Sequence, residues 1–153
     1  DMAGLKGRGE RHRIVLPGGS ALVIDESYNA NPASMAATIR SLGEEREVER
    51  RVAVLGAMRE LGEHSDELHA GLAPAIRDAK VDSVILIGPE LAPLAAALAG
   101  AVQVTRVDNV DEAGVAVLAD LRPGDALLVK ASNSVGLARL VERVTKGEAQ
   151  CST

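Results

Sequence analysis

The stretch ALVIDESYNANP (residues 21–32) passes from an apolar run to a polar junction and then to a typical helix start. The run ALVI has the length and composition of a buried β-strand. The closing Asn31-Pro32 favours a helix start, because Asn caps helix N-termini and Pro suits the first helical position. A strand that leads directly into a helix predicts an α/β fold. Ligands of open α/β sheets bind at the carboxyl ends of strands, so we expect a ligand at residues 25–32.

Short apolar runs of strand length recur along the chain and favour a β-sheet. The first two runs are joined by PGGS (residues 17–20), which is typical of a hairpin, whereas helix-length segments separate the later ones. We therefore expect a mostly parallel six-stranded sheet with one antiparallel edge. The predicted strands are residues 13–16, 21–25, 51–55, 83–87, 103–107 and 126–129.

Apolar residues at helical spacing predict four helices between and after these strands. The charged segment at residues 44–51 is interpreted as a solvated helix end and loop. The apolar faces of the four helices are Met35, Ile39 and Leu42; Leu68, Leu72 and Ile76 after Ser65; Val110, Ala113, Val117 and Leu121; and Leu137, Leu140, Val141 and Val144.

Length and composition favour one compact α/β domain. The chain has 153 residues, 46% of them hydrophobic, but no Phe, no Trp and one Tyr, so Val, Leu, Ile and Ala must build the core. Residues 1–12 are expected to be an interdomain linker because residues 4–13 are rich in Gly and Arg and have no apolar period. The domain itself is expected at residues 13–153, with further domains preceding it in the native protein.

Charge and cysteine content narrow the classes of partner. A net charge of −5 without a basic face argues against nucleic-acid binding. The single Cys151 excludes an internal disulfide and a cysteine-based zinc site, and favours a reducing cytoplasm. Apolar runs are too short for a membrane span or a signal peptide, so we expect no membrane insertion.

Several familiar catalytic and nucleotide-binding motifs are absent from the sequence. No predicted strand is followed by Gly-x-Gly-x-x-Gly, and no Gly-Lys-Ser or Gly-Lys-Thr of a P-loop occurs. His12, His64 and His69 are scattered, and a metal pair is not expected from the last two, which lie five residues apart. No Ser/His/Asp arrangement is visible. We therefore expect neither a metal site nor a complete catalytic centre in this chain.

Three polar strand ends remain as candidate sites. In the first, residues 25–32, Asp25 and Glu26 could accept hydrogen bonds from a ribose and Tyr28 could cover a purine. The second, residues 56–62, carries Glu60 after a glycine-permitted turn. The third, residues 130–134 (KASNS), could pair a carboxylate with Lys130 and with donors at a helix start.

Each strand end also has a purely structural interpretation. Asn31 could simply cap the next helix while Tyr28 covers the core, and residues 56–62 could be an ordinary loop. Likewise, Ser132 or Ser134 could merely cap the last helix.

Together, IDESYNANP (residues 24–32) with Ser34 and Met35, VLG (54–56) with Met58, ELG (60–62) with His69, and LVK (128–130) with SNS (132–134) resemble one family. They are similar to the C-terminal domain of MurF-type Mur ligases, the UDP-N-acetylmuramoyl-tripeptide:D-alanyl-D-alanine ligases. The resemblance implies a Rossmann-like, three-layer α/β domain with helices on both faces of the sheet. It also implies a cytoplasmic enzyme of peptidoglycan precursor synthesis, in which ATP activates the tripeptide carboxylate and the dipeptide amine attacks the acyl phosphate.

In such ligases three domains share the work, and this chain resembles only the last. The resemblance implies that ATP and Mg²⁺ are held mainly by a central P-loop domain, and that an N-terminal domain binds the UDP sugar. We expect a monomer whose isolated C-terminal domain is inactive. By position, the ATP-binding residues are Arg8, Asp25, Glu26, Tyr28, Asn29 and Asn31, and the dipeptide-binding residues are Lys130, Ser132, Asn133, Ser134 and Glu60.

Two positions depart from the family pattern, which commonly has Asp at the place of Ala57 and Gly at the place of Ala131. Two other functions stay open: a stand-alone module that binds a nucleotide or peptide, and a sibling Mur or folylpolyglutamate ligase with a different amine substrate.

Overall fold

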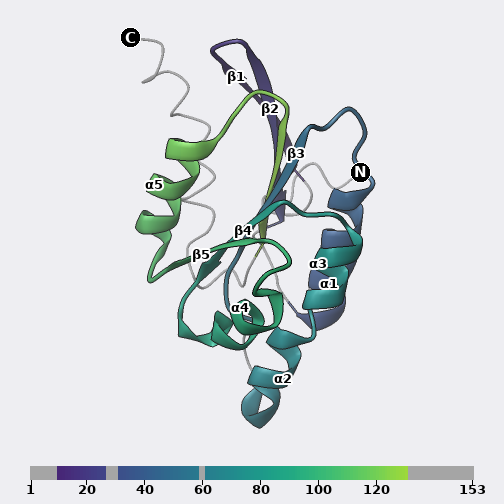
Figure 1. Cartoon of the computed structure of the whole chain (residues 1–153), viewed down its shortest axis with the longest axis vertical. Helices are drawn as coiled ribbons and strands as arrows, with labels where there is room; N and C mark the ends of the chain where they lie inside the picture. Colours follow the sequence, from purple (N-terminus) through teal and green to yellow (C-terminus); the bar gives the residue numbers. More distant parts are fainter. Residues whose placement is uncertain (1–9, 27–30, 59–60, 131–153) are drawn as a thin grey trace.

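The computed structural model describes residues 10–26, 31–58 and 61–130. In these ranges the chain forms one six-stranded sheet with helices on both faces (Figure 1). The strand order is β1-β2-β6-β3-β4-β5, in which only β1 runs antiparallel to its neighbour. The mostly parallel sheet with an antiparallel edge is therefore confirmed. The strands are β1 (Glu10–Leu16), β2 (Gly19–Glu26), β3 (Arg50–Leu55), β4 (Ser83–Ile87), β5 (Gln103–Val107) and β6 (Asp125–Lys130).

The edge hairpin follows from its turn residues. Pro17 and Gly18 lie between β1 and β2, and Gly18 adopts a φ of 91°, which suits glycine best. β1 begins at Glu10, three residues before the predicted start at Arg13. Residues 10–12 extend the strand because they pair in register with β2, and Glu10 is the partner of Asp25. Such pairing satisfies backbone groups whatever the side chains.

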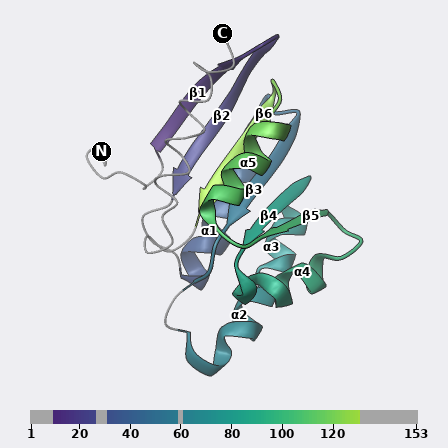
Figure 2. The same ribbon diagram turned by 90° about the vertical axis from the view of Figure 1, so that its left-hand side faces the viewer.

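Within the described ranges, the helices form two layers of unequal size. Helices α1 to α4 cover one face of the sheet and α5 covers the other, as Figures 1 and 2 show. Two apolar clusters, one on each side of the sheet, make up the core. The helices are α1 (Pro32–Gly43), α2 (Ser65–Ala70), α3 (Ala73–Asp78), α4 (Ala92–Leu98) and α5 (Val110–Asp120), with short 3-10 helices η1 (Gly62–His64) and η2 (Pro89–Leu91).

The predicted continuous helix through Leu68, Leu72 and Ile76 is wrong. The chain forms α2, a turn at Gly71 and Leu72, and then α3. Pro74 explains the break, because proline has no N–H with which to continue the hydrogen-bond ladder and is tolerated only in the first turn of a helix. Leu72 and Ile76 are nevertheless buried in the same apolar cluster.

The interpretation of residues 44–51 as a solvated helix end and loop is confirmed for exposed Arg46 but wrong for Arg50 and Arg51. Arg51 donates from Nε to the carbonyl of Leu42 at 3.0 Å and from Nη2 to that of Glu45 at 2.9 Å, which satisfies carbonyls at the end of α1. Arg50 donates to both carboxylate oxygens of buried Asp125, at 3.0 and 2.7 Å. Both arginines belong to β3 and join it to its surroundings.

Candidate functional site

The three predicted polar strand ends, which follow β2, β3 and β6, meet at one edge of the sheet. β6 lies between β2 and β3, so Lys130 is in register with Glu26 on one side and with Leu55 on the other. Residues more than one hundred positions apart in the sequence thus become neighbours (Figure 2). This edge, at the carboxyl ends of β2, β6 and β3, is where ligands of parallel sheets bind. We call it the carboxyl edge.

Lys130 is the central charged side chain of the carboxyl edge, and only 3% of it is exposed. A buried ammonium is costly unless opposite charge or hydrogen-bond acceptors surround it. Glu26, one strand away in register, supplies an opposite charge on the same face of the sheet. Both residues make polar or electrostatic interactions in the structure. The backbone carbonyl of Lys130 also accepts the N–H of Gly56 at 3.0 Å, which joins the first residue after β3 to the end of β6.

The two carboxylates at the end of β2 lie on opposite faces of the sheet. Asp25 is buried and Glu26 is partly exposed, and successive residues of a strand point to opposite sides. Only Glu26 therefore shares a face with Lys130 and α1. A partly exposed carboxylate at a strand end fits the acceptor that a ribose hydroxyl needs. Asp25 lies on the face that α5 covers, so the structure does not bring it together with Glu26.

Asn31 caps α1, as one of the two interpretations predicted. Its Oδ1 accepts the N–H of Ser34 at 2.9 Å, while its own N–H donates to Ser34 Oγ at 3.2 Å. This reciprocal capping box, followed by Pro32, fixes where α1 starts. The cap thereby sets where the first turn of α1 begins, at the end of residues 25–32. A ligand role for Asn31 remains a prediction.

The segment after β3 (residues 56–58) is anchored by a histidine. Met58 donates its buried N–H to Nε2 of His69 at 3.0 Å, and His69, on α2, is 0% exposed. The other ring nitrogen, Nδ1, lies 2.8 Å from the carbonyl oxygen of Ser65 and 3.2 Å from its Oγ. Because a backbone N–H can only donate, Nε2 must accept and Nδ1 must carry the proton. His69 is therefore a neutral imidazole with both nitrogens engaged.

Sequence reasoning missed this function of His69. It treated the residue as part of a family motif and as a poor partner for a metal. A usable signal was Ser65, four residues before His69 on one helix face, which offers a ring nitrogen a local acceptor. The contact with Met58 has no such local signature, because it joins α2 to a strand end.

Ala57, at a position where the family commonly has Asp, is buried in the apolar cluster that also contains Met58. A methyl group fits there without needing a hydrogen bond, whereas a carboxylate would need one. Ala131 lies outside the described residues. The predicted site residues that also lie outside them are Arg8, Tyr28, Asn29, Glu60, Ser132, Asn133 and Ser134.

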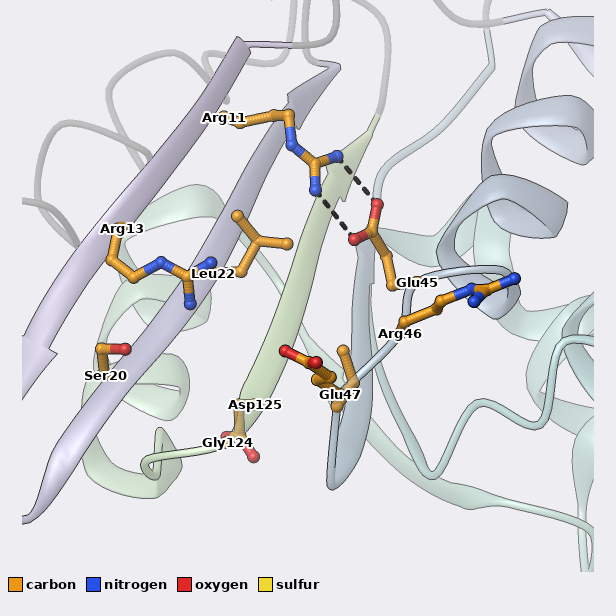
Figure 3. Close-up of a pocket in the computed structure, with 10 residues that line it drawn as sticks. Arg11, Arg13, Ser20, Leu22, Glu45, Arg46, Glu47, Gly124 and Asp125 are labelled. Atoms are coloured by element: carbon orange, nitrogen blue, oxygen red, sulfur yellow. Dashed lines mark hydrogen bonds and ion pairs between the residues drawn. The ribbon is translucent and has the colours of Figure 1, made fainter.

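A pocket of about 260 Å³ lies toward the opposite, amino end of the strands (Figure 3). Arg11 on β1 forms a two-pronged ion pair with Glu45 across it, with both distances 2.8 Å. Hydrogen bonding from Arg11 lowers the pKa of the Glu45 carboxyl below its ordinary value. The three arginines that line the pocket are balanced by three carboxylates, so it offers no net charge to an anion. It is separate from the predicted site.

Residues 10–26, 31–58 and 61–130 hold no cluster of three or more His, Cys, Asp or Glu side chains suited to a metal ion. Among its helices, none is both long and apolar enough to cross a membrane.

Comparison with known proteins gives a consistent result. Residues 7–133 match the family described as Mur ligase, glutamate ligase domain. The UDP-N-acetylmuramoyl-tripeptide--D-alanyl-D-alanine ligase of Synechocystis sp. is 34% identical over 141 residues, covering 91% of this chain and 30% of that protein. The ligase of the same name from Mycobacterium tuberculosis (strain H37Rv) is 36% identical over 155 residues, covering 86% of this chain and 30% of that protein.

A solved structure agrees with these relatives. The crystal structure of MurF ligase from Thermotoga maritima in complex with ADP matches with a TM-score of 0.76 and 27% identity, over 95% of this chain and 32% of that one. The chain thus spans about 30% of the length of its relatives. Since the family match extends over residues 7–133, which is most of the chain, the protein belongs to the Mur ligase family and carries the glutamate ligase domain of that family.

Proposed function

We propose that this chain is the C-terminal domain of an ATP-dependent ligase that joins D-alanyl-D-alanine to UDP-N-acetylmuramoyl-tripeptide. The observation that carries the proposal is the carboxyl edge, where Lys130 lies between Glu26 and the segment after β3. The names of the similar ligases, which match most of this chain, support the choice of substrates. The product would be a precursor of peptidoglycan, made in the cytoplasm.

In the proposed division of labour, this chain binds and encloses while other domains carry out phosphate chemistry. It contains no P-loop sequence, and its described residues hold no magnesium cluster. A central domain of the same protein would therefore hold Mg²⁺ and most of the ATP, and an N-terminal domain would hold the UDP sugar. ATP supplies the phosphate that activates the tripeptide carboxylate. The isolated chain would be an inactive monomer.

The dipeptide would bind beside Lys130. A carboxylate attracts an ammonium more strongly in a desolvated setting than in water, and Lys130 is almost fully buried. The residues that follow it, Ser132, Asn133 and Ser134, would add hydrogen-bond donors, and Glu60 would approach from the neighbouring strand end. Closure of the domain would exclude water from the activated carboxylate and favour attack by the amine.

ATP would approach from the β2 side of the same edge. Glu26 is the described residue best suited to a ribose hydroxyl, because it is partly exposed and lies on the face shared with α1. Tyr28, Asn29 and Asn31 would line the adenosine, and Arg8 would reach a phosphate. Asp25, which points to the other face, would act on the nucleotide only through its neighbours in β2 and β6.

The test is phosphate release by the full-length protein that contains this chain. It is given ATP, magnesium and UDP-N-acetylmuramoyl-tripeptide, with D-alanyl-D-alanine compared with single amino acids and with no amine. Release that requires the dipeptide is expected, and the isolated chain should release none. Release with a different amine would indicate a sibling ligase, and no release with any amine would favour a binding module.

A further inference from the structure

We propose that His69 is a positioning residue for the dipeptide: it fixes residues 56–58 beside Lys130 without touching the substrate itself. The inference rests on the proposed function for its substrate and on the structure for its geometry. Two hydrogen bonds hold residues 56–58 at the carboxyl edge. Gly56 is tied to the carbonyl of Lys130 at 3.0 Å, and Met58 is tied to His69 at 3.0 Å.

The anchor is rigid because every group in it is buried or engaged. Gly56, Ala57 and Met58 are buried, so the Met58 N–H has no water as an alternative partner. His69 is fully buried, and the bond from its Nδ1 to Ser65 holds the ring on the first turn of α2. The backbone between the two ties, from Gly56 to Met58, therefore has little freedom to move relative to Lys130.

The hydrogen bonds of His69 also exclude a role as a cation or as a proton donor at Nε2. A proton on Nε2 would face the Met58 N–H, so the ring serves as a neutral acceptor rather than as a cation or a proton donor. An acceptor of similar reach should therefore replace it, and an apolar ring of similar size should not. The side-chain oxygen of Gln reaches about as far as Nε2, whereas that of Asn is shorter.

The experiment uses the full-length ligase with His69→Phe, His69→Gln and His69→Asn, and Ile76→Ala as a control. Ile76 is fully buried in the same apolar cluster, on α3, and takes no part in the hydrogen bonds of the anchor, so Ile76→Ala lowers stability without removing them. The KM values for D-alanyl-D-alanine and for ATP, together with kcat, are measured for each variant. Amide hydrogen exchange of Met58 is measured in parallel.

For His69→Phe we expect the KM for D-alanyl-D-alanine to rise about tenfold and the KM for ATP to change less than about twofold. His69→Gln should recover the dipeptide KM to within about threefold, and His69→Asn should not. Exchange at Met58 should accelerate about tenfold or more in His69→Phe and stay slow in His69→Gln. If His69→Phe does not fold, the Gln and Asn pair decides alone.

Two results would overturn the inference: an equal rise in the dipeptide KM for Ile76→Ala, or an unchanged dipeptide KM in both His69→Phe and His69→Asn. Failure of the proposed function is distinguishable, because it would already show in the unmodified ligase as phosphate release that does not need the dipeptide. In that case the exchange of Met58 still decides whether His69 anchors the segment.

Discussion

At the scale of single residues, the carboxyl edge depends on Lys130. Its ammonium is buried at the end of the central strand pair, between the register positions of Glu26 and Leu55. A charge in such a place is retained only when its surroundings compensate it, and it then interacts strongly with any further charge that reaches it. These properties suit a residue that recognises a carboxylate.

Replacing Lys130 tests that role directly. In the full-length ligase, Lys130→Ala should raise the KM for D-alanyl-D-alanine about tenfold or more, because a charge-assisted hydrogen bond is lost, and should change the KM for ATP by less than about twofold. Steady-state phosphate release measures both. Lys80→Ala is the matched control, since Lys80 is an exposed lysine after α3. Equal losses for dipeptide and ATP would remove the assignment.

The ion pair of Arg11 and Glu45 makes stability depend on pH. The pKa of Glu45 is lowered by hydrogen bonding from Arg11, so the pair stabilises the fold above the ordinary value of 4.5 and is lost as pH falls through the folded-state pKa. Urea denaturation should show that Glu45→Gln lowers the free energy of unfolding by about 0.5–1 kcal/mol at pH 7 and leaves it almost unchanged at pH 3.

Glu47→Gln is the control for this pair, because Glu47 is exposed and forms no ion pair with the described residues. A cost of Glu45→Gln that is the same at both pH values would contradict the assignment of the effect to the Glu45 carboxylate.

At the scale of elements, a cluster of charges holds together the amino ends of β3 and β6 and the end of α5. Arg50 binds Asp125 through two nitrogens, and also binds the carboxylate and the carbonyl of Asp120 at the end of α5. Asp125 additionally accepts the N–H of Arg122 at 2.9 Å. Hydrogen bonding to Asp125 raises the pKa of Arg50, so the guanidinium stays charged. The cluster thereby fixes the two strands whose other ends form the carboxyl edge.

Removing a carboxylate from this cluster should lower the free energy of unfolding strongly only if that carboxylate is buried. The Asp125 side chain is 1% exposed. Asp125→Ala would leave the charge of Arg50 partly uncompensated, so the free energy of unfolding of this variant should be about 3 kcal/mol lower. Asp120→Ala should cost no more than about 1 kcal/mol, because that side chain is 46% exposed. Urea denaturation of both variants measures the difference. Similar costs for the two would mean that burial does not set the strength of the cluster.

At the scale of the whole molecule, the sheet separates two regions of different character. The carboxyl edge carries Lys130, Glu26 and the anchored segment, whereas the amino end carries the charge-balanced pocket with Arg11 and Glu45. A partner domain that supplies ATP would approach the first of these regions in the proposed enzyme. The second lies at the opposite end of the strands and would act mainly on stability.

Much of this architecture could be predicted from local sequence patterns. The six apolar runs became strands because each is apolar over a length that a sheet buries, and Asn31-Pro32 started a helix because both residues favour that position. The break between α2 and α3 was missed because the apolar spacing continues across Pro74, although proline interrupts the hydrogen bonding.

The rest depends on contacts between distant segments. The pairing of Arg50 with Asp125 spans 75 positions, so nothing local distinguishes it from a solvated charge. The hydrogen bond between Met58 and His69 joins the segment after β3 to α2, and no local sequence pattern indicates that these two elements touch. Resemblance pointed to the carboxyl edge, but only the strand order shows that Glu26 and Lys130 are neighbours there while Asp25 faces away.

The order of the strands also bears on how the chain folds. β6 comes last of the six strands in the sequence, yet it lies between β2 and β3, which do not pair with each other. Until β6 is made, the hairpin of β1 and β2 cannot join the group of β3, β4 and β5 into one sheet. Pairings between distant segments form slowly because their loops must close first. During synthesis, the two halves would leave the ribosome as separate parts with exposed strand edges, and the carboxyl edge would be completed only when β6 pairs with β2 and β3.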